Sequence, residues 1–157
     1  MKRLGTPSGC LLFVLLATAL GLTAGCGDGR PQRVPVAGTV TVDGKPLTAG
    51  FIRVVPDDAR PATGKIDADG RFRLTTFDER DGCVTGTHRV EVIAFDTISP
   101  STIRWLVPPK YRDTSTSGLT VTVDGPIDSL AIELSWQGGK PYVERFETAG
   151  DTDPSQL

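Results

Sequence analysis

The amino-acid sequence predicts an all-β fold, an antiparallel sandwich of about seven strands that follows an N-terminal export segment. Short runs in the middle of the chain alternate apolar and polar residues, the two-residue period of a half-buried strand. Between these runs lie many of the 18 Gly and 12 Pro residues, which favour turns. After the export segment, no run shows the spacing of an amphipathic helix.

Length and composition point to one ordinary globular domain. The chain has 157 residues, of which 38% are hydrophobic and 23% charged. The net charge is −2, with both signs mixed along the chain, so a nucleic-acid partner is not expected. Of the three Cys residues, only Cys83 falls in the expected folded region, which excludes an internal disulfide framework.

The first 25 residues have the order of a secretory signal. Lys2 and Arg3 form a positive start, residues 11–20 form an apolar run, and small residues lead to Cys26. The alternative is a retained transmembrane helix. The apolar run is shorter than the ~20 residues that a membrane span requires, which favours a cleaved signal.

The ending Ala24-Gly25-Cys26 resembles the lipobox of bacterial lipoproteins, although Thr23 stands where that family usually has Leu. The resemblance implies cleavage before Cys26, a diacylglycerol on its thiol and an acylated N-terminus. Ordinary cleavage nearby, or cleavage with Cys26 left free, are the alternatives. A lipidated tether at residues 26–33 would hold the domain close to a membrane of the bacterial cell envelope.

The first strands come with two hairpins. Residues 36–42 alternate and then turn at Asp43-Gly44, and Asp-Gly between β-rich runs is a strong hairpin signal. Residues 51–55 form the next expected strand. A second hairpin runs from 63–66 through a turn at 67–70 into 71–74, where Gly70 supplies a positive φ. In this second hairpin Phe72 and Leu74 are expected to face the core.

The second half of the domain alternates more weakly. Strands are expected at 87–95, 119–123 and 130–136, with Trp136 in phase with the core positions of the last one. Residues 96–117 are long and irregular, and Pro108-Pro109 cannot donate to a strand ladder. We therefore expect a domain over 34–147 and a frayed, disordered tail over 148–157.

Chemistry-bearing residues are few, and no catalytic, cofactor-binding or metal site is expected. His88 is the only histidine and has no visible partner set, so burial at a strand start is the simpler interpretation. Cys83 lacks a clearly basic neighbourhood and is expected to be an unpaired, partly buried thiol. The run 67–70 fails the spacing of a calcium loop and is explained by the turn.

A family resemblance covers roughly residues 34–136. The runs at 36–47, 63–64, 67–72, 84–92, 109–111 and 117–121 resemble the carboxypeptidase regulatory-like, or transthyretin-like, domain found in small bacterial lipoproteins. The resemblance implies a seven-stranded prealbumin-like sandwich, related to the immunoglobulin-like ones. A hydroxyisourate hydrolase in that family has several His and Arg site residues and a Tyr-Arg-Gly-Ser ending. Because this chain has one His and ends differently, that activity is not expected here.

These observations predict a lipid-anchored, non-catalytic envelope protein with a structural, adhesive or protein-interaction role. The alternative is a module that binds carbohydrate or peptidoglycan through the loop from Trp105 to Tyr111. Exposed, coplanar rings in a groove would favour a sugar, whereas buried rings and a free sheet edge would favour a protein partner.

Overall fold

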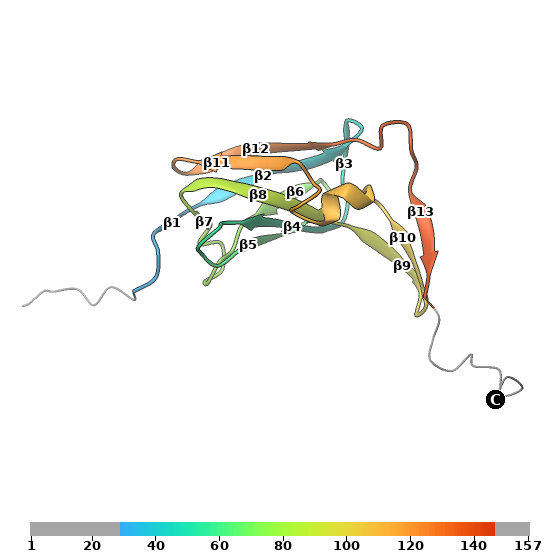
Figure 1. Ribbon diagram of the computed structural model, residues 1–157, viewed down its shortest axis with the longest axis horizontal. Helices are drawn as coiled ribbons and strands as arrows, with labels where there is room; N and C mark the ends of the chain where they lie inside the picture. The colour runs from blue at the N-terminus through green and yellow to red at the C-terminus, as the bar shows by residue number, and fades with distance from the viewer. Residues whose placement is uncertain (1–28, 147–157) are drawn as a thin grey trace, which may run out of the picture. The chain divides into compact units, whose positions relative to one another are not determined.

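The computed structural model describes residues 29–146 (Figure 1). Every element belongs to one compact unit, Pro31–Leu157, and of the other unit, Met1–Arg30, only the last two residues are described. The predicted signal segment, Cys26 and the predicted tail lie outside the described residues.

The described part of the chain is all-β, as predicted, and its one helical element is a short 3-10 helix. The strands and this helix are β1 (Arg33–Val34), β2 (Val36–Val42), β3 (Lys45–Pro46), β4 (Gly50–Val55), β5 (Ala62–Ile66), β6 (Arg71–Arg73), β7 (Cys83–Val84), β8 (Gly86–Ile93), β9 (Phe95–Ser99), β10 (Thr102–Trp105), η1 (Pro109–Arg112), β11 (Leu119–Val123), β12 (Ile127–Leu134) and β13 (Tyr142–Arg145).

Two four-stranded sheets form a β-sandwich-like body. One has the order β11-β8-β4-β5 and is antiparallel throughout. In the other, β2 pairs with β12 on one side and with β3 and β6 on the other. The β12–β2 pair is parallel, so the prediction of a wholly antiparallel sandwich is wrong there. Alternation fixes which face a strand buries, but it is the same for a parallel and an antiparallel neighbour.

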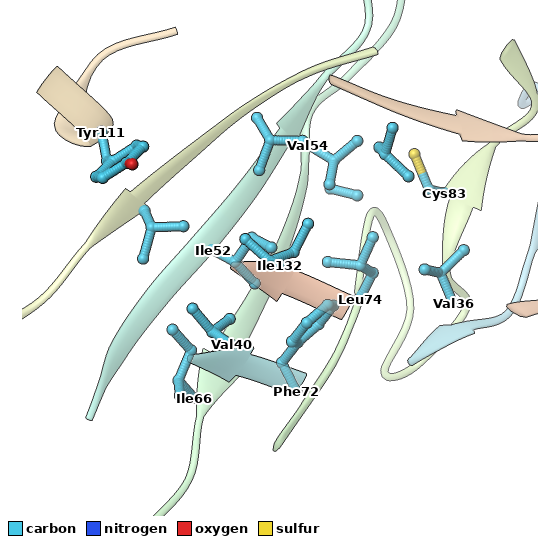
Figure 2. Close-up of a cluster of buried hydrophobic side chains, with 14 of the residues drawn as sticks. Val36, Val40, Ile52, Val54, Ile66, Phe72, Leu74, Cys83, Tyr111 and Ile132 are labelled. Atoms are coloured by element: carbon cyan, nitrogen blue, oxygen red, sulfur yellow. The ribbon is translucent and has the colours of Figure 1, made fainter. Parts of the chain in front are cut away.

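Side chains from both sheets form the core. Val40 and Ile132 from one sheet meet Ile52 and Val54 from the other, and all four are at most 5% exposed (Figure 2). Phe72 joins the same cluster from β6. The predicted alternation of the first strands and of the second hairpin is therefore confirmed.

Both predicted turns are confirmed. Asp43 and Gly44 have φ values of 48° and 76°, and β2 and β3 pair on either side of them. Gly70 has a φ of 79°, and its N–H donates to the Asp67 carbonyl oxygen at 3.0 Å. Oδ1 of Asp67 accepts from the backbone N–H groups of Asp69 and Arg71 at 2.9 and 2.8 Å, which fixes the turn.

The prediction of an irregular segment at 96–117 is wrong in part. β9, β10 and β13 form a separate three-stranded sheet within this unit (Figure 1). Four of the five residues of β9 are exposed, so this strand buries no face in the core. A strand that buries no face does not require apolar and polar residues to alternate, so the sequence shows no strand pattern there.

Two single residues also differ from expectation. Alternation within the expected strand at 87–95 would turn Glu91 toward solvent, but it is 7% exposed because Arg53 on the adjacent strand lies 2.6 Å from its carboxylate. Trp136 was expected in the core, yet β12 ends at Leu134 and Trp136 is only half-buried. Gln137 has a φ of 52°, so the chain turns there and the alternation of buried and exposed residues in β12 does not continue.

Candidate functional site

The three-stranded sheet carries both the predicted Trp105 and most of the exposed apolar side chains of the described chain. Trp105 lies opposite Phe95 on one side and Tyr142 on the other. The rings of Phe95 and Trp105 meet edge to face, with centroids 5.5 Å apart. One face of this sheet is therefore lined by three aromatic residues in a row.

Trp105 is already engaged on this face. The guanidinium of Arg112 lies 3.8 Å from the centre of its ring and also donates to the Tyr142 hydroxyl at 3.1 Å. The indole Nε1–H donates to the Glu144 carboxylate. Both a face and the polar atom of Trp105 thus have partners within the chain.

Tyr111 belongs to the sandwich core instead. Its side chain comes from η1, is 6% exposed and packs in the main cluster (Figure 2). Its hydroxyl accepts from the backbone N–H of Ser135 at 3.2 Å. Trp105 and Tyr111 therefore do not offer the shared exposed platform that the sugar-binding alternative requires.

Among residues 29–146, β13 is an edge strand that pairs only with β10, so no other described strand lies along its outer edge. The Phe146 N–H donates to the Ser101 carbonyl oxygen at 2.7 Å. Backbone groups of an antiparallel strand point toward its partner at every second residue, so those of Glu144 also point toward β10. The backbone N–H and C=O groups of Val143 and Arg145 consequently face away from the sheet.

Large apolar side chains are exposed at both edges of this sheet, on β13 and on β9, which lies on the far side of β10. Val143 is 55% exposed and Phe146 47%, and Ile98 and Phe95 on β9 are exposed to similar degrees. Isolated exposed apolar residues are ordinary, but three on one small sheet, with Phe146 directly after its last strand, are not. Sequence reasoning missed this surface, and the only available signal was Tyr142-Val143, a β-favouring pair followed closely by Phe146.

The two other candidate residues, His88 and Cys83, are both buried. His88 is 6% exposed, and its Nε2 lies 2.8 Å from the Val84 carbonyl oxygen. Cys83 is fully buried and unpaired, and burial raises the pKa of its thiol to about 11. A thiol with such a pKa is protonated at neutral pH and is a poor nucleophile.

Residues 29–146 hold neither a cluster of metal ligands nor a membrane-spanning helix. No three His, Cys, Asp or Glu side chains gather there as a ligand set for a metal ion. No helix in this part of the chain is long and apolar enough to cross a membrane.

Comparison with known proteins gives no match among family models, curated proteins or solved structures. The resemblance to the carboxypeptidase regulatory-like domain therefore stays a prediction.

Proposed function

We propose that this chain is an exported, lipid-anchored and non-catalytic protein that holds a partner protein close to a bacterial membrane. The partner adds an extended segment of its own backbone to the open edge of β13. The sandwich, with the prealbumin-like arrangement expected from the sequence, is the rigid support for this docking sheet.

The open β13 edge is the observation that carries this proposal. Natural sheet edges are usually shielded by Lys, Pro, bulges or a covering segment, because unpaired backbone groups attract other strands. Lys140 and Pro141 precede β13, but the strand itself presents Val143 at 55% exposure. Only a polypeptide supplies the matching row of N–H and C=O groups, which favours a protein partner over a sugar.

A non-catalytic role is supported by the state of the two candidate nucleophile or base residues. The imidazole of His88 is committed to a backbone carbonyl, and the Cys83 thiol is buried with a raised pKa. The membrane location rests on the sequence pattern that ends at Cys26.

Photo-crosslinking in intact envelopes tests the docking proposal. A photoreactive amino acid replaces Phe146 beside the open edge, or, as a control, Glu133, which is exposed on β12. We expect one discrete protein adduct from position 146 that position 133 does not give.

A substitution at the edge then tests the mode of binding. Val143→Pro removes one outward N–H without breaking the ladder to β10, and should abolish the adduct. Val143→Thr keeps the N–H and the β-branched shape, and should retain it. An adduct that survives Val143→Pro, or that forms equally from position 133, would contradict docking at β13.

A further inference from the structure

A basic cleft lies on the outer surface of the sandwich, on elements other than the three-stranded sheet. Its volume is about 780 Å³, and its lining comes mainly from β2, β5 and β6. Ala37 and Gly38 on β2 contribute small residues, and Thr39 and Thr63 contribute hydroxyl groups. Lys65, Arg71, Arg73 and Arg80 contribute four positive charges.

Three of these cations lack an acidic partner. Arg80 lies 3.3 Å from Glu79, but no ion pair is formed by Lys65, Arg71 or Arg73 among the described residues. Asp67, Glu79 and Asp128 also line the cleft, so its four positive and three negative side chains leave a net charge of +1. Asp67 has one carboxylate oxygen held by two backbone N–H groups, and Asp128 makes no ion pair within the described chain.

The strand register concentrates the three charges. Thr63 and Thr75 exchange backbone hydrogen bonds of 2.9 Å, and the Asp67 N–H donates to Arg71 at 2.9 Å. These bonds join the two ends of β5 and β6, which belong to different sheets, and Lys65 and Arg73 lie between them on the lining of the cleft. Arg71 and Arg73 are two residues apart on β6, and both are exposed on the same face.

Like charges that line one cleft repel each other, and this repulsion costs stability unless an opposite charge offsets it. The chain as a whole carries a net charge of −2, so a cluster of unpaired cations in one cleft is not a consequence of overall composition. An anionic ligand would relieve the repulsion and gain several charge-assisted hydrogen bonds.

We propose that this cleft binds a phosphate group. The guanidinium of one Arg can bind both oxygens of a carboxylate, so three cations that line one cleft exceed what a carboxylate needs. A phosphate offers more acceptor oxygens and a larger charge, and it matches two guanidinium groups and one ammonium. The group belongs either to a soluble phosphorylated molecule or to a lipid headgroup. The proposal stands independently of docking at β13.

Isothermal titration calorimetry on the full chain in maltoside micelles tests this proposal. The probes are pyrophosphate, which carries two linked phosphates, and short-chain phosphatidylglycerol below its micellar concentration. Phosphatidylcholine with the same chains is the neutral-headgroup control. The test variant combines Lys65→Gln, Arg71→Gln and Arg73→Gln. The matched control combines Lys45→Gln, Arg104→Gln and Lys140→Gln, which removes the same charge from exposed positions outside the cleft.

We expect the triple cleft variant to weaken binding by at least about tenfold, which is the factor that the loss of a single charge-assisted bond accounts for. The control variant should bind like the unchanged chain. Binding of pyrophosphate identifies a soluble ligand, and binding of phosphatidylglycerol alone identifies a headgroup. If the triple variant loses its folded thermal transition, Lys65→Gln alone is used.

Three outcomes would overturn the proposal. They are no binding of either phosphate probe, equal losses in the cleft and control variants, and tighter binding of a glutamate-rich peptide than of pyrophosphate.

Discussion

At the scale of single residues, Gly44 and Gly70 occupy turns with nearly the same φ but have different surroundings. A Cβ added at Gly44 would meet nothing within 4 Å, whereas one at Gly70 would lie 2.7 Å from the Val40 carbonyl oxygen. Backbone oxygen cannot swing aside as a flexible side chain can, so the clash adds to the strain of a positive φ.

We therefore predict that Gly70→Ala lowers the free energy of unfolding by clearly more than Gly44→Ala. The strain alone costs on the order of 1 kcal/mol at either position. Denaturant unfolding of the two purified variants measures the difference. Equal losses of unfolding free energy in the two variants would contradict a clash between a Cβ at position 70 and the Val40 carbonyl oxygen.

Asp81 organises the polar loop after β6. Its carboxylate accepts from the backbone N–H groups of Thr76, Phe77 and Asp78 at 2.7, 3.1 and 3.1 Å. Nε of Arg33 lies 2.8 Å away, as an ion pair rather than an aligned hydrogen bond. Burial raises the pKa of Asp81, but these N–H groups and Arg33 outweigh it and hold the pKa below its usual range.

A lowered pKa links this carboxylate to acid stability. The contribution is fully present above the ordinary pKa of an Asp and is lost as the pH falls through the lower pKa of the folded state. We predict that, below about pH 4, the free energy of unfolding of Asp81→Asn falls less steeply with decreasing pH than that of the unchanged chain. Denaturant unfolding from pH 6 down to about pH 2 tests this, and an unchanged acid slope would contradict it.

At the scale of elements, β5 and β6 carry like charges that line one cleft. We predict that Lys65→Glu raises the free energy of unfolding by about 0.2–1 kcal/mol, because it replaces the repulsion between Lys65 and the two Arg residues of β6 with an attraction. Lys45→Glu on β3 is the control, since its partner on β2 is the uncharged Val42. Thermal unfolding measures both, and a lower midpoint for Lys65→Glu than for Lys45→Glu would argue against the repulsion.

The same elements show what local sequence determines. The turns at Asp43-Gly44 and Asp69-Gly70 were predictable because their backbone conformation depends on a few adjacent residues. The buried alternation of β2 and β8 was predictable because both strands face one core. Parallel pairing of β12 with β2 was not, since it depends on where a distant strand arrives.

The sheet that carries the candidate site was the hardest to predict. β9, β10 and β13 lie mostly outside the core, so burial leaves no periodic pattern in them. Trp105 was singled out as a surface residue, but its indole is held by Glu144 from a strand far along the chain and by Arg112 from the neighbouring 3-10 helix. Such partners are invisible in one sequence without its fold.

At the scale of the whole molecule, two surfaces lie on different sheets. The open edge belongs to β13, and the basic cleft belongs to β2, β5 and β6. One is suited to a polypeptide backbone and the other to a phosphate. A lipid-anchored protein would keep both surfaces close to a membrane, where local concentration favours even weak binding.

Our central claim is that a lipid on Cys26 holds this sandwich at a membrane. The positive start, the apolar run at 11–20 and the small residues before Cys26 all converge on that residue. The direct test is mass spectrometry of the N-terminal peptide of the chain purified from membranes. We predict a mature chain that begins at Cys26 and carries a diacylglycerol and an acyl group, and a Cys26→Ser precursor that stays uncut and takes up no fatty-acid probe. An unmodified N-terminus at any other residue would contradict the claim.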